Sequence, residues 1–215
     1  MHPVICMITD RHRSGVGGEG ALVDRVAAAA HAGVHLIQVR ERDLDGRALT
    51  HLVARCVSAA RGTMARIVVN DRLDVALAAG AHGAHLRADS APVLRVRATV
   101  PRRFIVGRSV HSRDQAHYAG LDGALDYLIF GTVFESRSKP GSDVAGSDAL
   151  AAAVSATMMP VLAVGGVTPG RVNEVARAGA AGIAAIGLFA DCPGGALPFI
   201  VEQTTLAFDI PESVP

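Results

Sequence analysis

The feature that most constrains the fold is a strand-like apolar run that recurs eight times along the chain. The runs are rich in β-branched residues, and their hydrophobicity is continuous rather than alternating, which is typical of strands buried on both faces of a parallel sheet. They occupy residues 4–10, 35–41, 65–71, 83–89, 103–110, 126–133, 160–166 and 182–189. Such a repeat predicts an α/β fold with a parallel sheet.

Segments with helical periodicity separate the runs. In residues 21–33, the apolar side chains of Leu22, Val26 and Ala29 fall on one helical face. Residues 48–60 and 171–180 repeat this spacing, and glycines at 33, 62, 80 and 179 stand where helices commonly end. Eight strand–helix units in 215 residues predict a (β/α)8 TIM barrel, with a doubly wound open sheet as the alternative.

The composition is even along the chain and predicts one domain over residues 1–215, with 190–215 as the last helix and a C-terminal tail. A formal net charge of +1 and 4% aromatic residues argue against nucleic-acid binding. No apolar stretch is long enough to span a membrane, and the first residues lack a signal-peptide pattern. Three scattered cysteines fit a cytoplasmic protein without a disulfide framework. The sequence leaves a homo-oligomer open.

Polar and glycine residues gather at the ends of the predicted strands. In a (β/α)8 barrel these ends lie on one face, which is where active sites are built. We expect this face to bind an anionic, phosphorylated ligand, because cations and hydrogen-bond donors outnumber carboxylates there. The predicted binding residues are Gln38, Arg40, Arg42, Asn70, Ser109, Ser136, Ser138, Lys139, Gly165, Gly166 and Gly187.

Glycines at the ends of the last two strands predict a phosphate cup. Gly165, Gly166 and Gly187 would let backbone N–H groups approach an anion, although tight turns alone would also explain them. Arg40 and Lys139 could neutralise a phosphate or a carboxylate. Alternatively, Arg40 forms an ion pair with Glu41 or another loop acid, and Lys139 is a solvated loop residue.

His111 is the predicted catalytic residue. Its imidazole follows the fifth strand, and the ordinary pKa of histidine suits proton transfer near neutral pH. The alternative is a structural histidine at the start of the next helix. His85 stands within a strand-like run, and we expect it to be structural. Asp71, after the third strand, could bind Mg²⁺ or cap the following helix.

These motifs resemble those of the thiamine-phosphate synthase and thiazole tautomerase superfamily. The resemblance covers most of the chain and keeps the motifs in order: QVRER at 38–42, VNDRLDVAL at 69–77, GRSVHS at 107–112, FGTVFES at 130–136, SKPG at 138–141 and VLAVGGVTPG at 161–170. It implies a barrel enzyme of thiamine biosynthesis that acts on a small phosphorylated thiazole.

The synthase branch joins a pyrimidine diphosphate to a thiazole phosphate, releases pyrophosphate and uses Mg²⁺. Its first metal-binding aspartate corresponds to Asp71. The second metal-binding aspartate of the synthases ends a Gly-Gln-x-Asp stretch. Here that stretch reads Arg87-Ala88-Asp89-Ser90, so Ser90 occupies the position at which the aspartate is expected. The chain also departs at Arg42, where a lysine is expected, and at Gly187, where a serine is expected.

The tautomerase branch needs no metal and matches the GRSVHS motif. The resemblance therefore favours a thiazole tautomerase, which would aromatise a thiazole carboxylate phosphate with His111 as the acid/base and without a cofactor. One alternative is a thiamine-phosphate synthase with Mg²⁺ at Asp71. The other is a non-catalytic sensor of a phosphorylated ligand.

Overall fold

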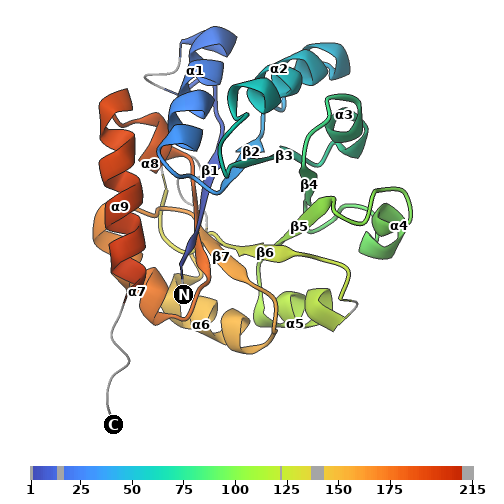
Figure 1. Ribbon diagram of the computed structural model, residues 1–215. Helices are drawn as coiled ribbons and strands as arrows, with labels where there is room; N and C mark the ends of the chain where they lie inside the picture. Colours follow the sequence, from blue (N-terminus) through green and yellow to red (C-terminus); the bar gives the residue numbers. More distant parts are fainter. Residues whose placement is uncertain (1, 14–16, 122, 137–142, 210–215) are drawn as a thin grey trace.

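Eight parallel strands form a closed barrel in the computed structural model, which describes residues 2–13, 17–121, 123–136 and 143–209 (Figure 1). The strands are β1 (Val4–Ile8), β2 (Leu36–Val39), β3 (Arg66–Asn70), β4 (Gly83–Leu86), β5 (Ile105–Val110), β6 (Tyr127–Phe130), β7 (Val161–Val164) and β8 (Gly182–Ala185). Strand β1 pairs with β8 from Val4↔Gly182 to Met7↔Ala185, which closes the sheet. The predicted TIM barrel is therefore confirmed, and the open-sheet alternative is wrong.

A ring of helices surrounds the barrel (Figure 1). The helices are α1 (Gly18–His31), α2 (Gly46–Ala59), α3 (Leu73–Ala78), α4 (Val93–Arg97), α5 (Arg113–Leu121), α6 (Gly146–Ser155), α7 (Val172–Arg177), α8 (Gly187–Ala190) and α9 (Leu197–Phe208). Short 3₁₀ turns cover Pro169–Arg171 and Gly194–Ala196. No helix in the described part of the chain is long and apolar enough to cross a membrane.

The sequence between β1 and α1 has one misleading feature. Residues 15–20 read GVGGEG, which has the Gly-x-Gly-x-x-Gly spacing of dinucleotide-binding loops. That motif functions where the strand order of an open sheet reverses. The closed barrel has no such reversal, so the glycine spacing alone carries no functional weight here.

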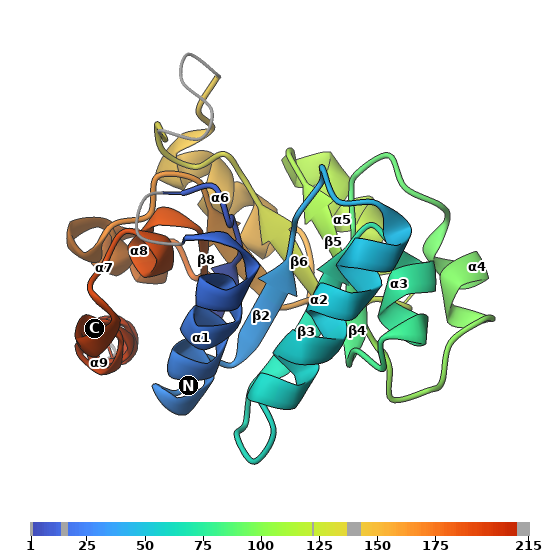
Figure 2. The ribbon, with the colours of Figure 1, turned by 90° about the horizontal axis from the view of Figure 1, so that it is seen from above.

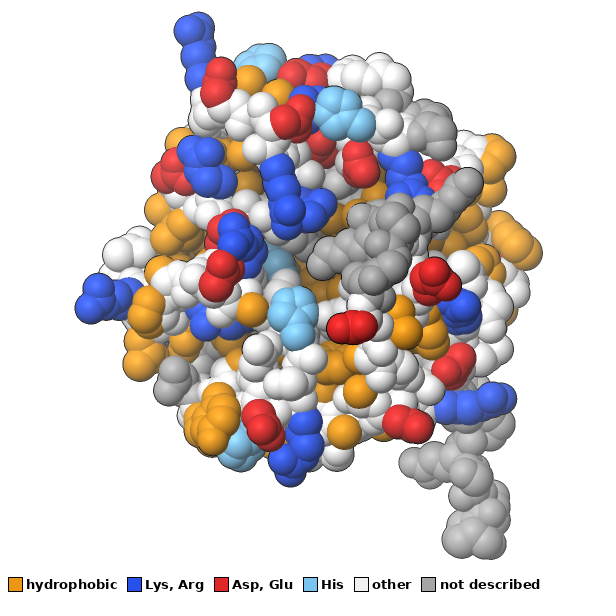
Figure 3. All heavy atoms as spheres, turned by 180° about the vertical axis from the view of Figure 1, so that it is seen from behind, with side chains coloured by type: hydrophobic (Ala, Val, Ile, Leu, Met, Phe, Trp, Pro, Cys, Tyr) orange, Lys and Arg blue, Asp and Glu red, His pale blue; other side chains and the backbone are white. Residues whose placement is uncertain are grey.

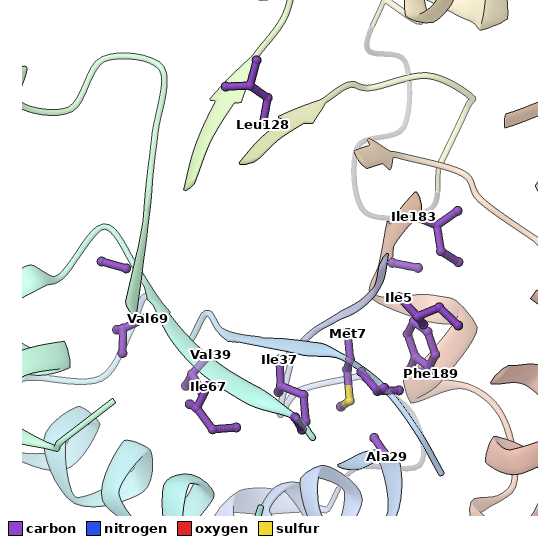
Figure 4. Packing of buried hydrophobic residues seen from close by; sticks show 14 of the residues in the cluster. Ile5, Met7, Ala29, Ile37, Val39, Ile67, Val69, Leu128, Ile183 and Phe189 are labelled. Carbon is purple, nitrogen blue, oxygen red and sulfur yellow. The ribbon is translucent and has the colours of Figure 1, made fainter. Parts of the chain in front are cut away.

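Successive side chains along each strand alternate between two apolar layers. Ile5, Met7 and Ile37 point outward and are covered by helices, as Figure 4 shows for Ala29 of α1 beside Met7. Their neighbours Cys6 and Leu36 point into the barrel, where they form a second cluster with Val68, Tyr127, Ile129, Leu162 and Ala184. Both faces of the strands are therefore buried, which explains why the apolar runs are continuous.

The barrel interior is filled near its middle by one large aromatic side chain. Tyr127 of β6 is buried and lies against Gly107 of β5, where an added Cβ would come within 2.1 Å of the tyrosine ring. Above this level the strands end, and the described residues that directly follow β1, β2 and β6 extend on the same side of the barrel (Figure 2). The pocket inside the described barrel consequently opens at its carboxyl end.

Candidate active site

A hollow of about 690 Å³ opens at the carboxyl end of the barrel; it is called the central pocket below. Figure 3 shows basic and histidine side chains, interspersed with acidic ones, around the middle of the face opposite to that of Figure 1. Inward-facing residues of a strand are two positions apart, and the same alternation continues past the strand ends. The predicted residues that line the central pocket are Gln38, Arg40, Arg42, Asn70, Ser109, His111, Ser136 and Gly165.

Two amide side chains are joined on the wall of this pocket. Nε2 of Gln38 donates a hydrogen bond to Oδ1 of Asn70 over 2.9 Å. Gln38 is 2% exposed, and its Oε1 has no hydrogen-bond partner among the described residues. A buried acceptor without a partner is costly unless a ligand or water donates to it.

The backbone of Arg40 is held by a hydrogen-bond network beneath it. The Arg40 backbone N–H donates to Oγ1 of Thr9 at 3.0 Å, and Thr9 donates to the buried Glu41 carboxylate at 2.6 Å. Glu41 also accepts from Arg11 at 3.1 Å. The proposed Arg40–Glu41 ion pair is therefore not formed in the described chain.

The Arg40 guanidinium is left facing the central pocket. Burial, and next the charge of Arg42, lower the pKa of Arg40 from the ordinary arginine value. A guanidinium nevertheless stays protonated in proteins, so both residues carry full positive charge. An anion in this pocket would relieve the repulsion between them.

His111 lies at the rim of the pocket with one ring nitrogen engaged. Nδ1 is 2.5 Å from the carbonyl oxygen of Gly131, and because a carbonyl only accepts, Nδ1 carries the proton. The backbone N–H of His111 donates to Oε1 of Gln115 in α5 at 2.8 Å. These two bonds orient the ring and leave Nε2 as the atom that can meet a ligand.

His85, which the sequence indicated as a structural histidine, also lines this pocket and has both ring nitrogens engaged by protein groups. Its Nδ1 is 3.0 Å from the Tyr127 hydroxyl, and its Nε2 is 2.9 Å from Oγ of Ser109. Burial lowers its pKa to about 3, so the ring is neutral. A neutral ring donates from one nitrogen and accepts at the other, which links Tyr127 to Ser109 in one hydrogen-bond chain.

The glycines of the predicted phosphate cup line a second, adjoining hollow of about 600 Å³, called the glycine pocket below. Gly165 and Gly166 have φ values of 99° and 62°, which favour glycine. A Cβ at Gly166 would lie 2.3 Å from the Glu135 carbonyl oxygen, so the backbones approach closely there. Arg171 donates to the Gly166 carbonyl at 3.2 Å and stacks on Phe134.

Gly187 lies in the glycine pocket beside a cation that the sequence did not reveal. A Cβ at Gly187 would come within 2.7 Å of Nη2 of Arg13. Arg13 forms a bidentate ion pair with Asp191 at 2.7 and 2.8 Å. The absent side chain at position 187 thus makes room for a guanidinium that lines both pockets. Of the remaining predicted residues, Ser138 and Lys139 lie outside the described residues.

The candidate metal residue Asp71 is held by two neighbours from the β4–α4 segment. Ser90 donates a hydrogen bond from Oγ to Asp71, and Nη1 of Arg87 lies 3.7 Å from the other carboxylate oxygen. Helix α3 has no side-chain cap, so the capping role considered for Asp71 is not observed. Within the described part of the chain, no group of three or more His, Cys, Asp or Glu side chains could hold a metal ion.

Comparison with known proteins places this site in a family. The family described as thiamine monophosphate synthase (TMP-TENI) matches residues 5–189, which include seven strands in full and all of β1 except Val4. The chain belongs to the thiamine monophosphate synthase family. The expected superfamily is thereby confirmed, and with it the place of the chain among enzymes of thiamine biosynthesis.

Curated relatives in this family carry the synthase name. The thiamine-phosphate synthase of Roseiflexus castenholzii is 37% identical over 191 residues, which cover 88% of this chain and 82% of the relative. That of Methanoculleus marisnigri is 40% identical over 167 residues, covering 76% and 77%. A solved thiamine phosphate pyrophosphorylase from Pyrococcus furiosus superposes with a TM-score of 0.77 at 29% identity, covering 93% of this chain and 96% of the other.

These findings overturn the expected tautomerase. The sequence interpretation gave most weight to the missing second carboxylate at Ser90 and to the GRSVHS motif around His111. Overall similarity to thiamine-phosphate synthases outweighs both, because it extends over most of each relative. A single residue that differs from the expected metal ligand, here Ser90, is a poor guide to the branch when neighbouring residues such as Arg87 also differ from the synthase pattern.

Sequence reasoning also missed the roles of Arg13 and Arg87, which line the central pocket. Arg13 follows the first strand by several residues and carried no motif. Arg87 could have been found, since it stands two positions after the inward-facing His85 and therefore shares its direction.

Proposed function

We propose that this chain is a thiamine-phosphate synthase, a transferase that joins a pyrimidine diphosphate to a thiazole phosphate. The observation that carries the proposal is the pair of adjoining pockets, which share Arg13, Ser136 and Gly165 in their walls. Two phosphorylated substrates need two anion sites that lie close enough for the reacting atoms of the substrates to meet. The synthase names of the relatives support this reading of the pair.

The glycine pocket suits the single phosphate of the thiazole. Gly165 and Gly166 bring backbone to its surface without side chains, and the guanidinium groups of Arg171 and of Arg13, which is paired with Asp191, also line it. Backbone N–H groups and guanidinium groups are the ordinary ligands of a phosphate in barrels of this kind. The thiazole ring would then point through the shared wall into the central pocket.

The central pocket suits the pyrimidine diphosphate. Its floor combines the apolar Ile8 and Ile129 with the polar Gln38, Asn70 and Ser109, which matches a flat heterocycle with hydrogen-bonding edges. Its rim carries guanidinium groups that suit the diphosphate. They are those of Arg13, Arg40, Arg42 and Arg87.

The chemistry requires a stabilised leaving group more than a proton shuttle. The thiazole ring nitrogen attacks the methylene carbon of the pyrimidine; the C–N bond forms, the C–O bond breaks, and inorganic pyrophosphate leaves with the electron pair. Arginines around the diphosphate stabilise the charge that develops on it. No proton has to move to or from carbon, so His111 would serve as a hydrogen-bonding group through Nε2.

The resemblance to synthases implies Mg²⁺ held between carboxylates, and the residues present do not fit that arrangement. Asp71 already accepts a hydrogen bond from Ser90, which stands where the second aspartate is expected. Arg87 lies 3.7 Å from Asp71, and Asp89 is engaged by Arg87 rather than aimed at Asp71. The steps above therefore rely only on the cations of the chain itself.

The test is to incubate purified protein with the pyrimidine diphosphate and the thiazole phosphate and to quantify thiamine phosphate and pyrophosphate. Mg²⁺ is varied from EDTA-treated to saturating conditions, and Gly166→Ala and Gly170→Ala serve as a site variant and a matched control. We expect the wild type to form the two products in equal amounts and Gly166→Ala to form neither. Binding of both substrates without product at every Mg²⁺ concentration would instead indicate a non-catalytic sensor.

A further inference from the structure

We propose that the Arg87 guanidinium takes the place of a divalent cation at the diphosphate site, with Asp71 holding the arginine instead of a metal. The ligand class is a diphosphate, and its identity as a substrate group rests on the proposed function. The inference concerns how the anion is held. The same arginine site would bind a diphosphate in a protein that does not turn it over.

Arg87 occupies the mouth of the central pocket in a defined position. It is the first residue after β4, and its side chain lines both the central pocket and a smaller hollow of about 270 Å³ beside it. Its side chain is 50% exposed, so the guanidinium can meet a ligand that enters from solvent. Arg40 and Arg42, from the segment after β2, line the same two hollows.

A hydrogen-bond relay orients this arginine. The Arg87 backbone N–H donates to Oγ of Ser90 at 2.9 Å, and that hydroxyl donates to Asp71. The guanidinium itself meets Asp89 at 2.5 Å through Nη2 and lies 3.7 Å from Asp71 through Nη1. Asp71 has a φ of 57°, which is unusual for a residue other than glycine, and its carboxylate lies in this cluster.

The arrangement is better suited to an anion than to Mg²⁺. Mg²⁺ prefers one or two carboxylates with several waters in octahedral geometry, whereas one of the Asp71 oxygens is already bonded to a hydroxyl. A fixed positive charge beside the other oxygen opposes entry of a divalent cation. The same charge favours a phosphate, which a guanidinium can bind through two parallel hydrogen bonds.

Two departures from the synthase pattern are explained together by this role. Arginine stands at position 87 where that pattern has glycine, and serine stands at position 90 where it has aspartate. A second carboxylate at position 90 would add negative charge beside Asp71, and a metal ion would then be needed to neutralise the pair of carboxylates. With an arginine supplying the cation, a hydroxyl at position 90 is sufficient to hold Asp71.

The first experiment measures binding of inorganic pyrophosphate to the full-length protein by calorimetry, in EDTA and in excess Mg²⁺. We expect the wild type to bind pyrophosphate in EDTA. Arg87→Gly should weaken this binding by about tenfold or more, as expected for losing hydrogen bonds to a charged group. Arg87→Lys should retain part of the affinity, and Arg103→Gly, which removes an exposed arginine outside the pocket, should leave it unchanged.

The second experiment measures the metal directly, by the electron paramagnetic resonance signal of free Mn²⁺. The wild type should take up little Mn²⁺ at this site, and the double variant Arg87→Gly/Ser90→Asp should gain a binding site and require the metal to bind pyrophosphate. The inference is overturned by pyrophosphate binding that needs Mg²⁺ in the wild type and is unaffected in Arg87→Gly.

These results separate the inference from the proposed function. Metal-free pyrophosphate binding through Arg87, together with no synthesis of thiamine phosphate, would refute the synthase and leave the arginine site standing. Synthesis of thiamine phosphate that depends on Mg²⁺ and not on Arg87 would support the synthase and refute the arginine site.

Discussion

Nε2 of Gln38 lies 2.9 Å from Oδ1 of Asn70, so the amides at the ends of β2 and β3 are joined on the wall of the central pocket. One N–H of the Gln38 amide is used in this contact, and its buried Oε1 is the acceptor that remains for a ligand donor. The pair therefore presents an acceptor at a defined position, and it makes the amide of Gln38 a candidate specificity determinant.

Gln38→Leu should weaken binding of the pyrimidine substrate by about tenfold, since one hydrogen bond to the ligand is lost. Calorimetry with the pyrimidine diphosphate measures the dissociation constant. Gln203→Leu, on the exposed surface of α9, is the control. Unchanged affinity in Gln38→Leu would mean that the free oxygen of Gln38 meets only water.

Gly166→Ala should reduce the free energy of unfolding by about 1–3 kcal/mol, because φ is positive and the Glu135 carbonyl is too close for a Cβ. It should also abolish binding of the thiazole phosphate, since the backbone of the cup must shift. Urea unfolding and ligand titration are the measurements. Gly170→Ala has open space around its Cβ and should change neither quantity.

Thr9→Val should destabilise the fold by about 1–3 kcal/mol and lower activity, because it removes one hydrogen-bond donor to the buried Glu41 and the acceptor of the Arg40 backbone N–H. Thr204→Val, which changes a buried threonine of α9, is the matched control for the loss of a hydroxyl. Equal losses of activity in the two variants would show that the network beneath Arg40 has no special role.

His85 should make stability fall as the pH is lowered. The unfolded residue titrates near 6.5, and burial lowers the folded pKa to about 3. Between these values the unfolded chain binds a proton that the folded chain does not. The free energy of unfolding should therefore drop by about 1.4 kcal/mol for each pH unit below 6.5, and be unaffected by this group above it.

The measurement compares urea unfolding of the wild type and His85→Gln at pH values on both sides of 6.5. His35 and His82 also have lowered pKa values through burial, but their contribution is the same in both proteins. The difference between the two slopes thus isolates His85. Parallel slopes would mean that His85 accepts a proton in the folded protein.

The barrel and the face that carries the polar residues could be predicted from the sequence. Continuous apolar runs report burial on both sides of each strand, and the residues at the ends of parallel strands must share one edge. His111 and Gln38 both line the central pocket for this reason, because their positions depend only on strand direction and a two-residue period.

The side-chain contacts of the charged residues at this face could not be predicted. Glu41 contacts Thr9 and Arg11 rather than the adjacent Arg40, and Arg13 reaches Gly187 from the opposite end of the chain. Such contacts depend on how two separate connections pack after the barrel closes. The resemblance favoured the wrong branch for a related reason, since it counted Ser90 as a missing ligand without seeing that Arg87 adjoins Asp71.

The sequence by itself determined the repeat, the parallel sheet and the edge at which polar residues gather, because these follow from local hydrophobic periodicity and strand direction; closure of the barrel was decided by the pairing of β1 with β8. Only the tertiary structure decided which charges meet: Arg87 with Asp71, Arg13 with Asp191, and His85 with Tyr127 and Ser109. Charge–charge and hydrogen-bond contacts act over a few ångströms between residues that are distant along the chain, so the packed barrel is what brings them together.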